Sequence, residues 1–149
     1  MGHKFGKNSL GKLETCHVDI IDILKNAIDR SMVDFGVSEG HRSIERQKQL
    51  FDEGKSKIDG ITKKGKHNYN PSRAVDIYIY HPDLSTRRKL AYDKVHLAYV
   101  AGVITAVADE LYEEGIIQSK VRWGGNWDSD GVIGLDQSFD DYPHFELIF

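Results

Sequence analysis

The chain has 149 residues, of which 40% are hydrophobic and 29% are charged, values ordinary for one soluble globular domain. Its formal net charge is −3, and its basic residues are spread along the chain, which argues against a nucleic-acid-binding protein. No apolar run approaches the roughly 18–20 residues that span a bilayer, and the N-terminus lacks the apolar stretch of a secretory signal. We therefore expect a monomer with a single domain over residues 1–149 and no membrane insertion.

The single cysteine, Cys16, excludes both an intramolecular disulfide and a cysteine-based zinc finger. It stands at the start of a predicted helix, where the adjacent His17 is the only local partner that could activate it. We expect a small, buried or half-buried thiol without a catalytic role.

The predicted elements begin with an amphipathic helix over residues 17–31, where apolar residues recur at three- and four-residue spacing. A strand follows within residues 33–40. There, Val33, Phe35 and Val37 alternate with small and polar residues, the period-two pattern of a strand with one buried face.

A short helix is predicted over residues 43–54, with Ser43 as the N-cap and Gly54 as the stop. Residues 55–72 then contain lysine, glycine, asparagine and proline with little apolar content. This composition predicts a long loop, and long loops inside compact domains are usually functional or disordered.

The second half of the chain is predicted to contain three strands, a turn-rich loop and a long helix with room for one break. Strands and helices do not alternate regularly along the chain. We therefore expect an α+β fold with a small antiparallel sheet flanked by helices. In chain order, the elements are a strand at 74–80, the helix at 85–114 with its stop at Gly115, a strand at 120–123, the loop at 124–134 and a strand at 144–149.

Two of these strands carry a metal-competent side chain on the face opposite their apolar residues. Asp76 is the informative one, because a carboxylate within an apolar strand is costly unless it is paired or bound to a cation. In the last strand, His144 lies opposite the face shared by Phe145, Leu147 and Phe149. The alternative for Asp76 is a carboxylate satisfied by the backbone or by an arginine.

His67 lies upstream in the predicted loop, and a lone loop histidine is usually only solvated or hydrogen-bonded. The combination of His67, Asp76 and His144 changes this interpretation, because it supplies two imidazoles and one carboxylate. These are the ligands of a catalytic zinc ion whose fourth position stays open to water. We expect one Zn²⁺ ion per chain.

Hydrolysis at such an ion also needs a base that accepts a proton from water. Asp141 stands three residues before His144, and Pro143 between them would stiffen the approach to the strand. The alternative for Asp141 is a solvated acidic turn, because Asp136 and Asp140 are close in the sequence.

Four segments spread over nearly the whole chain together resemble the zinc D,D- and L,D-peptidases. That family includes D-Ala-D-Ala carboxypeptidases and dipeptidases as well as the Hedgehog signalling domain. The closest resemblance is to phage endolysins of the L-alanyl-D-glutamate peptidase type, and it implies a Hedgehog/D,D-peptidase-like fold. The segments are KNSLGKLETCHVDIIDILKNAI, DFGVSEGHRSIERQKQL, HNYNPSRAVDIYIY, and WGGNWDSDG with DYPHFEL.

The resemblance implies that His67, Asp76 and His144 are the zinc ligands and that Asp141 is the general base. It also implies that Arg42 binds the substrate carbonyl, where a fixed guanidinium opposes the negative charge that develops on the oxygen. The alternative for Arg42 is a surface arginine at the start of a helix.

The resemblance further implies hydrolysis of the L-Ala–D-Glu bond in the peptidoglycan stem peptide. Without a signal peptide, we expect an enzyme made in the host cytoplasm that reaches the cell wall after release through a separate membrane pore. The first alternative is a D-Ala-D-Ala carboxypeptidase or dipeptidase of wall remodelling, which would usually need export. The second is a non-catalytic zinc-containing binding module, which need not retain Asp141 and Arg42 together.

The sequence departs from the family pattern in two places. Gly65 stands where many relatives have serine, and the gap from His67 to Asp76 is about two residues longer than the commonest spacing. Because a loop insertion costs little free energy, we expect the metal site to persist and the substrate rim to change.

Three further expectations concern the surroundings of the site. Trp123 and Trp127 are expected to pack under the sheet, with a rim contact to substrate as the alternative. Glu146 shares the face of the second histidine and is in a position to orient an imidazole. The oxygen-rich stretch 128–131 together with Asp136 is a weaker candidate for a second, calcium-binding site, because it lacks full EF-hand spacing.

Overall fold

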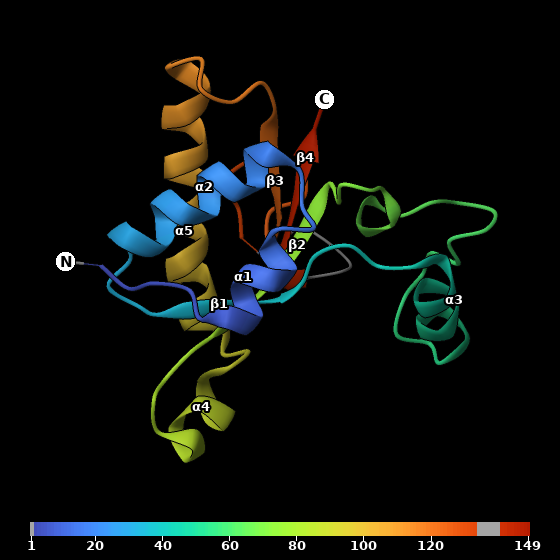
Figure 1. The fold of residues 1–149 in the computed structure, drawn as a ribbon, viewed down its shortest axis with the longest axis horizontal. Coiled ribbons are helices and arrows are strands. Elements are labelled where there is room, and N and C mark those ends of the chain that lie inside the picture. Colours follow the sequence, from blue (N-terminus) through green and yellow to red (C-terminus); the bar gives the residue numbers. More distant parts are fainter. Residues whose placement is uncertain (1, 134–140) are drawn as a thin grey trace.

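The computed structural model describes residues 2–133 and 141–149, and within them the chain forms the expected α+β fold (Figure 1). The elements are α1 (Lys7–Leu13), α2 (Val18–Arg30), β1 (Phe35–Glu39), α3 (Ile44–Asp52), the 3₁₀ turn η1 (Lys66–Asn68), β2 (Ala74–Ile79), α4 (Leu84–Leu90), α5 (Lys94–Glu113), β3 (Lys120–Gly124) and β4 (Asp141–Ile148).

The four strands form one sheet with the order β1-β2-β4-β3, and every neighbouring pair is antiparallel. The two central strands, β2 and β4, therefore come from distant parts of the chain. Their register sets Asp76 directly opposite His144. Side chains that are paired in this way across an antiparallel sheet project from the same face, so both residues lie on the face opposite the core.

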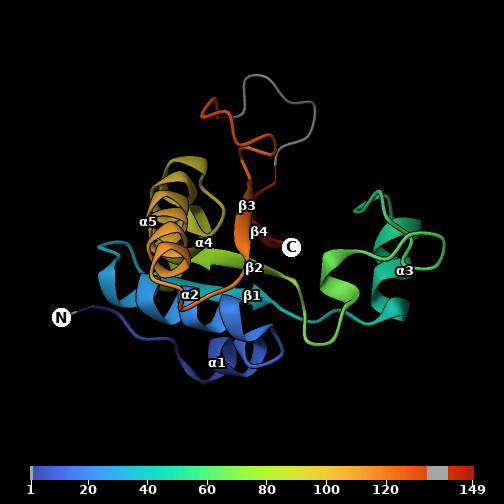
Figure 2. The same ribbon diagram turned by 90° about the horizontal axis from the view of Figure 1, so that it is seen from above.

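The helices α2 and α5 pack on one face of the sheet (Figure 2). The alternation in the strands explains this arrangement, because one face of β1, β2 and β4 carries their large buried apolar residues and faces these helices. α1 instead contacts β1, the edge strand, where the Ser9 hydroxyl accepts a hydrogen bond from Val37 N (3.0 Å). The buried apolar face of the sheet consists of Phe35, Val37, Val75, Ile77, Ile79, Trp123, Phe145 and Leu147.

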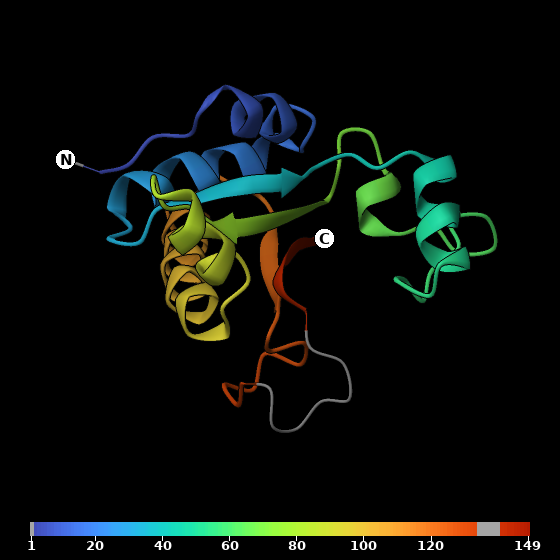
Figure 3. The ribbon, with the colours of Figure 1, turned by 90° about the horizontal axis from the view of Figure 1, so that it is seen from below.

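α3 lies apart from the α2–α5 layer, beyond the ends of β1 and β2. It lies beside η1, as the views from above and from below show (Figures 2 and 3). Its predicted ends are confirmed: the Ser43 side chain accepts from Arg46 N, and Gly54 adopts a φ of 75°. A backbone hydrogen bond links the start of this helical segment to η1: Arg42 N, just before the N-cap, donates to His67 O (2.8 Å).

The predicted long helix is broken as expected, with α5 starting afresh after Asp93, whose side chain accepts from His96 N. Judged by length and composition alone, α5 is long and apolar enough to cross a membrane, contrary to the expectation from the sequence, but the core helix of a globular domain meets the same criterion. One side of it packs against α2 and the sheet, as in the core helix of a globular domain. α1 was not predicted, because seven residues with two leucines are too few to show a helical period.

Two details of the last strand differ from the prediction. β4 begins at Asp141 rather than at His144, and Pro143 sits where the pairing with β3 is irregular, a position that tolerates its missing N–H. Phe149 does not join the core: it lies past the end of the strand and is 67% exposed. Its ring contacts the Arg73 guanidinium, 4.7 Å away, instead.

Cys16 is buried, as expected, and only 3% of its surface is exposed. Burial raises the pKa of its thiol to about 12, so the reactive thiolate is scarce at neutral pH. We expect the folded protein to show less than a tenth of the thiol reactivity with Ellman's reagent that it shows in denaturant. A fast reaction of the native protein would contradict this inert role.

Candidate metal centre

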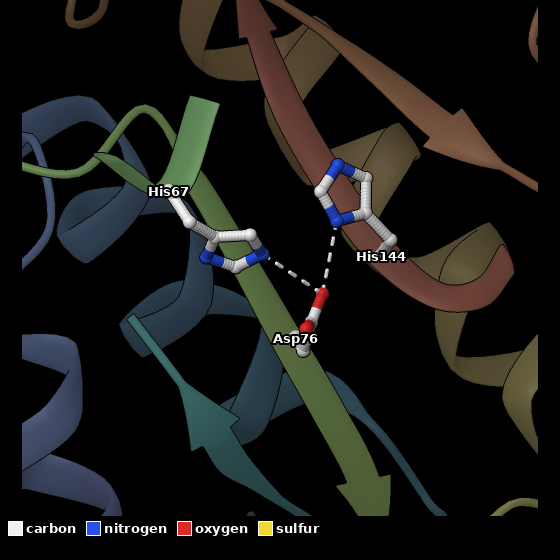
Figure 4. Close-up of side chains that lie close together, drawn as sticks. All are labelled: His67, Asp76 and His144. Atoms are coloured by element: carbon white, nitrogen blue, oxygen red, sulfur yellow. Dashed lines mark hydrogen bonds and ion pairs between the residues drawn. The ribbon is translucent and has the colours of Figure 1, made fainter. Parts of the chain in front are cut away.

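The structure brings His67, Asp76 and His144 together on the face of the sheet opposite the core (Figure 4). Asp76 Oδ1 lies between the two imidazoles, 3.3 Å from His67 Nε2 and 2.9 Å from His144 Nδ1. The three donor atoms all lie within 4.8 Å of one another. Two central strands and the η1 turn therefore converge on one point.

His67 is held by the η1 turn, with only 4% of its surface exposed. Its Nδ1 lies 2.7 Å from the Gly40 carbonyl oxygen, which can only accept, so Nδ1 carries the proton and Nε2 faces Asp76. A Cβ at Gly40 would lie 2.4 Å from Lys12 O and from the Thr15 hydroxyl, so this close approach needs glycine. Asn68 Oδ1 fixes the turn by accepting from Gly65 N (2.8 Å).

His144 is held from both sides of its ring. Its Nε2 lies 2.9 Å from Glu146 Oε1 and its Nδ1 faces Asp76. Burial opposes protonation, but the hydrogen bonds to Asp76 and Glu146 outweigh it and raise the pKa of His144 to about 10. Conversely, burial disfavours the Asp76 carboxylate, but the charge of His67 and the hydrogen bonds from both histidines lower its pKa well below the usual range. Asp76 is therefore an anionic donor at any physiological pH.

The donor set fits a zinc ion in both chemistry and spacing. Ligand atoms placed ~2.0–2.2 Å from a tetrahedral ion lie roughly 3.3 Å apart, close to the 3.3 Å and 2.9 Å measured from Asp76 to the two imidazoles. The three residues are the one group of metal-competent side chains found in residues 2–133 and 141–149.

Asp141 lies beside the three donors rather than among them. Its Oδ2 is 4.0 Å from His144 Nδ1, and 35% of its side chain is exposed. The pKa of the Asp141 carboxyl is raised, chiefly because burial disfavours its charged form. The positive charge of His144 opposes this shift, and the negative charge of Asp76 adds to it. A carboxylate with a raised pKa is a better proton acceptor than an ordinary aspartate.

Arg42 lies on the other side of Asp76, with its Nη2 3.6 Å from Asp76 Oδ2. Its Nε donates to Glu39 Oε1 (2.9 Å), a second bond joins Nη2 to the same carboxylate, and Nη1 donates to Gln47 Oε1 (2.9 Å). Only 12% of its side chain is exposed, so it is not a surface arginine at a helix start. Glu39 and Gln47 were not predicted from the sequence as partners of Arg42, and the three-residue spacing from Glu39 to Arg42 was the one available signal.

The two tryptophans differ in position, and the expected packing under the sheet holds for Trp123. Trp123 packs under the sheet, stacked on Phe145 at 6.5 Å, and its indole N–H donates to Tyr142 O (2.7 Å). The Trp127 ring instead lies 5.6 Å from that of His144, at the rim of the site.

The described part of the loop at 128–131 gives little support to the predicted calcium-binding site. Asp128 Oδ1 and Asp130 Oδ1 accept hydrogen bonds from Asp130 N (3.2 Å) and Val132 N (2.7 Å), as in ordinary turns. Asp136 and Asp140 lie outside the described residues.

Known proteins resemble this chain in sequence and in fold. The phage L-alanyl-D-glutamate peptidase family matches residues 1–148. The peptidoglycan L-alanyl-D-glutamate endopeptidase CwlK of Bacillus subtilis (strain 168) is 28% identical over 131 residues, which cover 85% of this chain and 68% of CwlK. The crystal structure of Serratia marcescens L-Ala D-Glu endopeptidase ChiX matches with a TM-score of 0.71 and 27% identity, over 98% of this chain and 91% of ChiX. The chain therefore belongs to the phage L-alanyl-D-glutamate peptidase family.

Proposed function

We propose that this peptidase binds one zinc ion through His67 Nε2, Asp76 Oδ1 and His144 Nδ1 and hydrolyses the L-Ala–D-Glu bond of the peptidoglycan stem peptide. The observation that carries the proposal is the convergence of these three donor atoms within 4.8 Å in a member of a peptidase family. A zinc ion at this place would polarise the scissile carbonyl and acidify a water molecule. The substrate places the action of the enzyme at the cell wall.

In this proposal, Asp141 is the general base that transfers a proton from the attacking water to the leaving amine. Its carboxylate accepts the proton of the attacking water and returns it to the nitrogen of the leaving amine. Two observations support this role: Asp141 lies within 4.0 Å of one donor group without being part of the donor set, and its pKa is raised. Its partial exposure leaves it accessible to a substrate on the open face of the sheet.

Arg42 is proposed to stabilise the negative charge that develops on the carbonyl oxygen. The bonds to Glu39 and Gln47 fix the plane of its guanidinium beside Asp76, so little reorganisation is needed during the reaction. Lysine would keep the charge but could not donate in both directions from a rigid fork.

Arg42→Lys should therefore lower turnover by about 10- to 100-fold, below the full ~10²–10³-fold cost of losing an oxyanion donor, with zinc content unchanged. Release of peptide from purified sacculi measures turnover, and elemental analysis measures zinc. Arg46→Lys, an exposed arginine on α3, is the matched control and should keep wild-type turnover. Equal rates for Arg42→Lys and the wild type would exclude the oxyanion role.

The bond specificity is tested by the products of sacculus digestion. Cleavage at L-Ala–D-Glu should release peptides that begin with D-Glu and leave L-Ala on the muramyl lactyl group, as mass spectrometry of both fractions can show. A chelator should stop the release, and added zinc should restore it. Loss of terminal D-Ala with the L-Ala–D-Glu bond intact would instead identify a D-Ala-D-Ala carboxypeptidase.

A further inference from the structure

A series of polar contacts extends from the metal centre across the sheet to β3, and it is buried at His144 and Glu146. His144 Nε2, the ring nitrogen that points away from Asp76, lies 2.9 Å from Glu146 Oε1. The second carboxylate oxygen, Glu146 Oε2, accepts a hydrogen bond from Arg122 Nη2 at 2.7 Å. Each oxygen of Glu146 thus has its own partner. Rotating the carboxylate out of its plane would weaken the contacts to both His144 and Arg122.

The backbone of the sheet determines this arrangement. Asp76 pairs with His144 across β2 and β4, and Arg122 pairs with Glu146 across β3 and β4. His144 and Glu146 are two residues apart in one strand, so their side chains leave the same face. The four residues therefore lie on one face of the sheet, as two neighbouring cross-strand pairs that share β4.

His144 and Glu146 are buried, whereas the Arg122 side chain at the outer end of these contacts is 39% exposed. Glu146 is 7% exposed, and its two oxygens lie against two nitrogen groups, His144 Nε2 and the Arg122 guanidinium, as expected of a carboxylate. The Trp127 ring lies beside this series of contacts: its centroid lies 5.6 Å from that of His144 and 5.5 Å from the Arg122 guanidinium carbon. Hydrogen bonds to charged groups in such surroundings are worth more than those in water.

We infer that Glu146, oriented by Arg122, is a positioning residue that selects which nitrogen of His144 faces the metal. A carboxylate can only accept, so Nε2 must carry a proton, and the lone pair of the neutral ring is then on Nδ1. Without Glu146, rotation of the ring by half a turn about its Cβ–Cγ bond would put the Cδ2 carbon where Nδ1 lies and remove the donor atom from the metal site. The inference rests on the proposed metal site and adds to it the residues that keep one of its ligands in place.

The test compares Glu146→Ala, Glu146→Gln and Arg122→Met with Glu110→Gln, a matched control in an exposed pair with Arg30. Zinc affinity is measured by competition with a chromophoric chelator, and ¹⁵N NMR of the zinc-loaded protein reports which ring nitrogen of His144 carries the proton. Outer partners of metal-bound histidines typically contribute ~10–100-fold in affinity, and we expect Glu146→Ala to lose that much. Glu146→Gln keeps one acceptor oxygen and should lose less, as should Arg122→Met.

In the wild type and in the control, the His144 Nε2–H signal should be present and should exchange slowly with solvent. In Glu146→Ala, it should exchange fast or vanish. Wild-type zinc affinity together with an unchanged His144 signal in Glu146→Ala would overturn the inference. If Glu146→Ala does not fold, zinc affinity and the His144 Nε2–H signal are measured on Glu146→Gln and Arg122→Met instead. Wild-type values for both readouts in both variants would then overturn the inference. Absence of stoichiometric zinc from the wild type would instead refute the metal site itself.

Discussion

Replacing His67 with alanine should abolish peptidase activity and remove most of the bound zinc. His67 supplies one of three donor atoms, and its Nε2 is 3.3 Å from Asp76 Oδ1. No other imidazole among the described residues joins this donor group, so nothing there can substitute for it. Elemental analysis of zinc per chain and peptide release from sacculi measure the two losses separately.

The matched control is His96→Ala, a histidine on α5 whose ring contacts Asp93 and not the metal centre. It should keep full zinc occupancy and activity. His67→Ala also loses the hydrogen bond to the Gly40 carbonyl, so circular dichroism must show that the variant is folded before its zinc content is interpreted. Full zinc occupancy in folded His67→Ala would remove His67 from the site.

The sequence predicted most of the fold because its strands alternate cleanly. In β2, Val75, Ile77 and Ile79 are all buried against the helices, and the alternation alone places Asp76 on the other face. The same pattern predicted which face His144 occupies. It could not predict that the two residues are paired, because register between strands far apart in the sequence depends on tertiary packing. Their shared suitability as zinc ligands and the resemblance to a known family connected the two residues before the structure did.

What the sequence could not provide are the contacts that hold the functional side chains. The Gly40 carbonyl that orients His67 has no residue-specific signal, because every residue has a carbonyl. Gln47 reaches Arg42 only because α3 is placed beside η1, and the side chain of Gln47 also donates to Ile58 O (2.6 Å). Such contacts come from the folding of a loop that has no periodicity to interpret.

Asp141→Ala should keep zinc and the fold but lose most of its turnover. Asp141 lies 4.0 Å from His144 Nδ1 and is not one of the three donors, so its removal leaves the donor set intact. Its backbone pairs with Gly124 at the irregular start of β4, and this pairing does not need the side chain. General-base catalysis typically contributes ~10²–10⁴-fold, which is the expected fall in the rate of peptide release at neutral pH.

Zinc content separates this variant from His67→Ala, because Asp141→Ala should retain one ion per chain while it loses a comparable part of its activity. Asp128→Ala, an exposed aspartate on the preceding loop, is the matched control and should behave as the wild type. A rate near that of the wild type in Asp141→Ala would show that another group takes the proton. Glu146 and Asp140 are then the next to replace. Glu146 is the weaker of the two, since both of its oxygens are already bonded, to His144 and to Arg122.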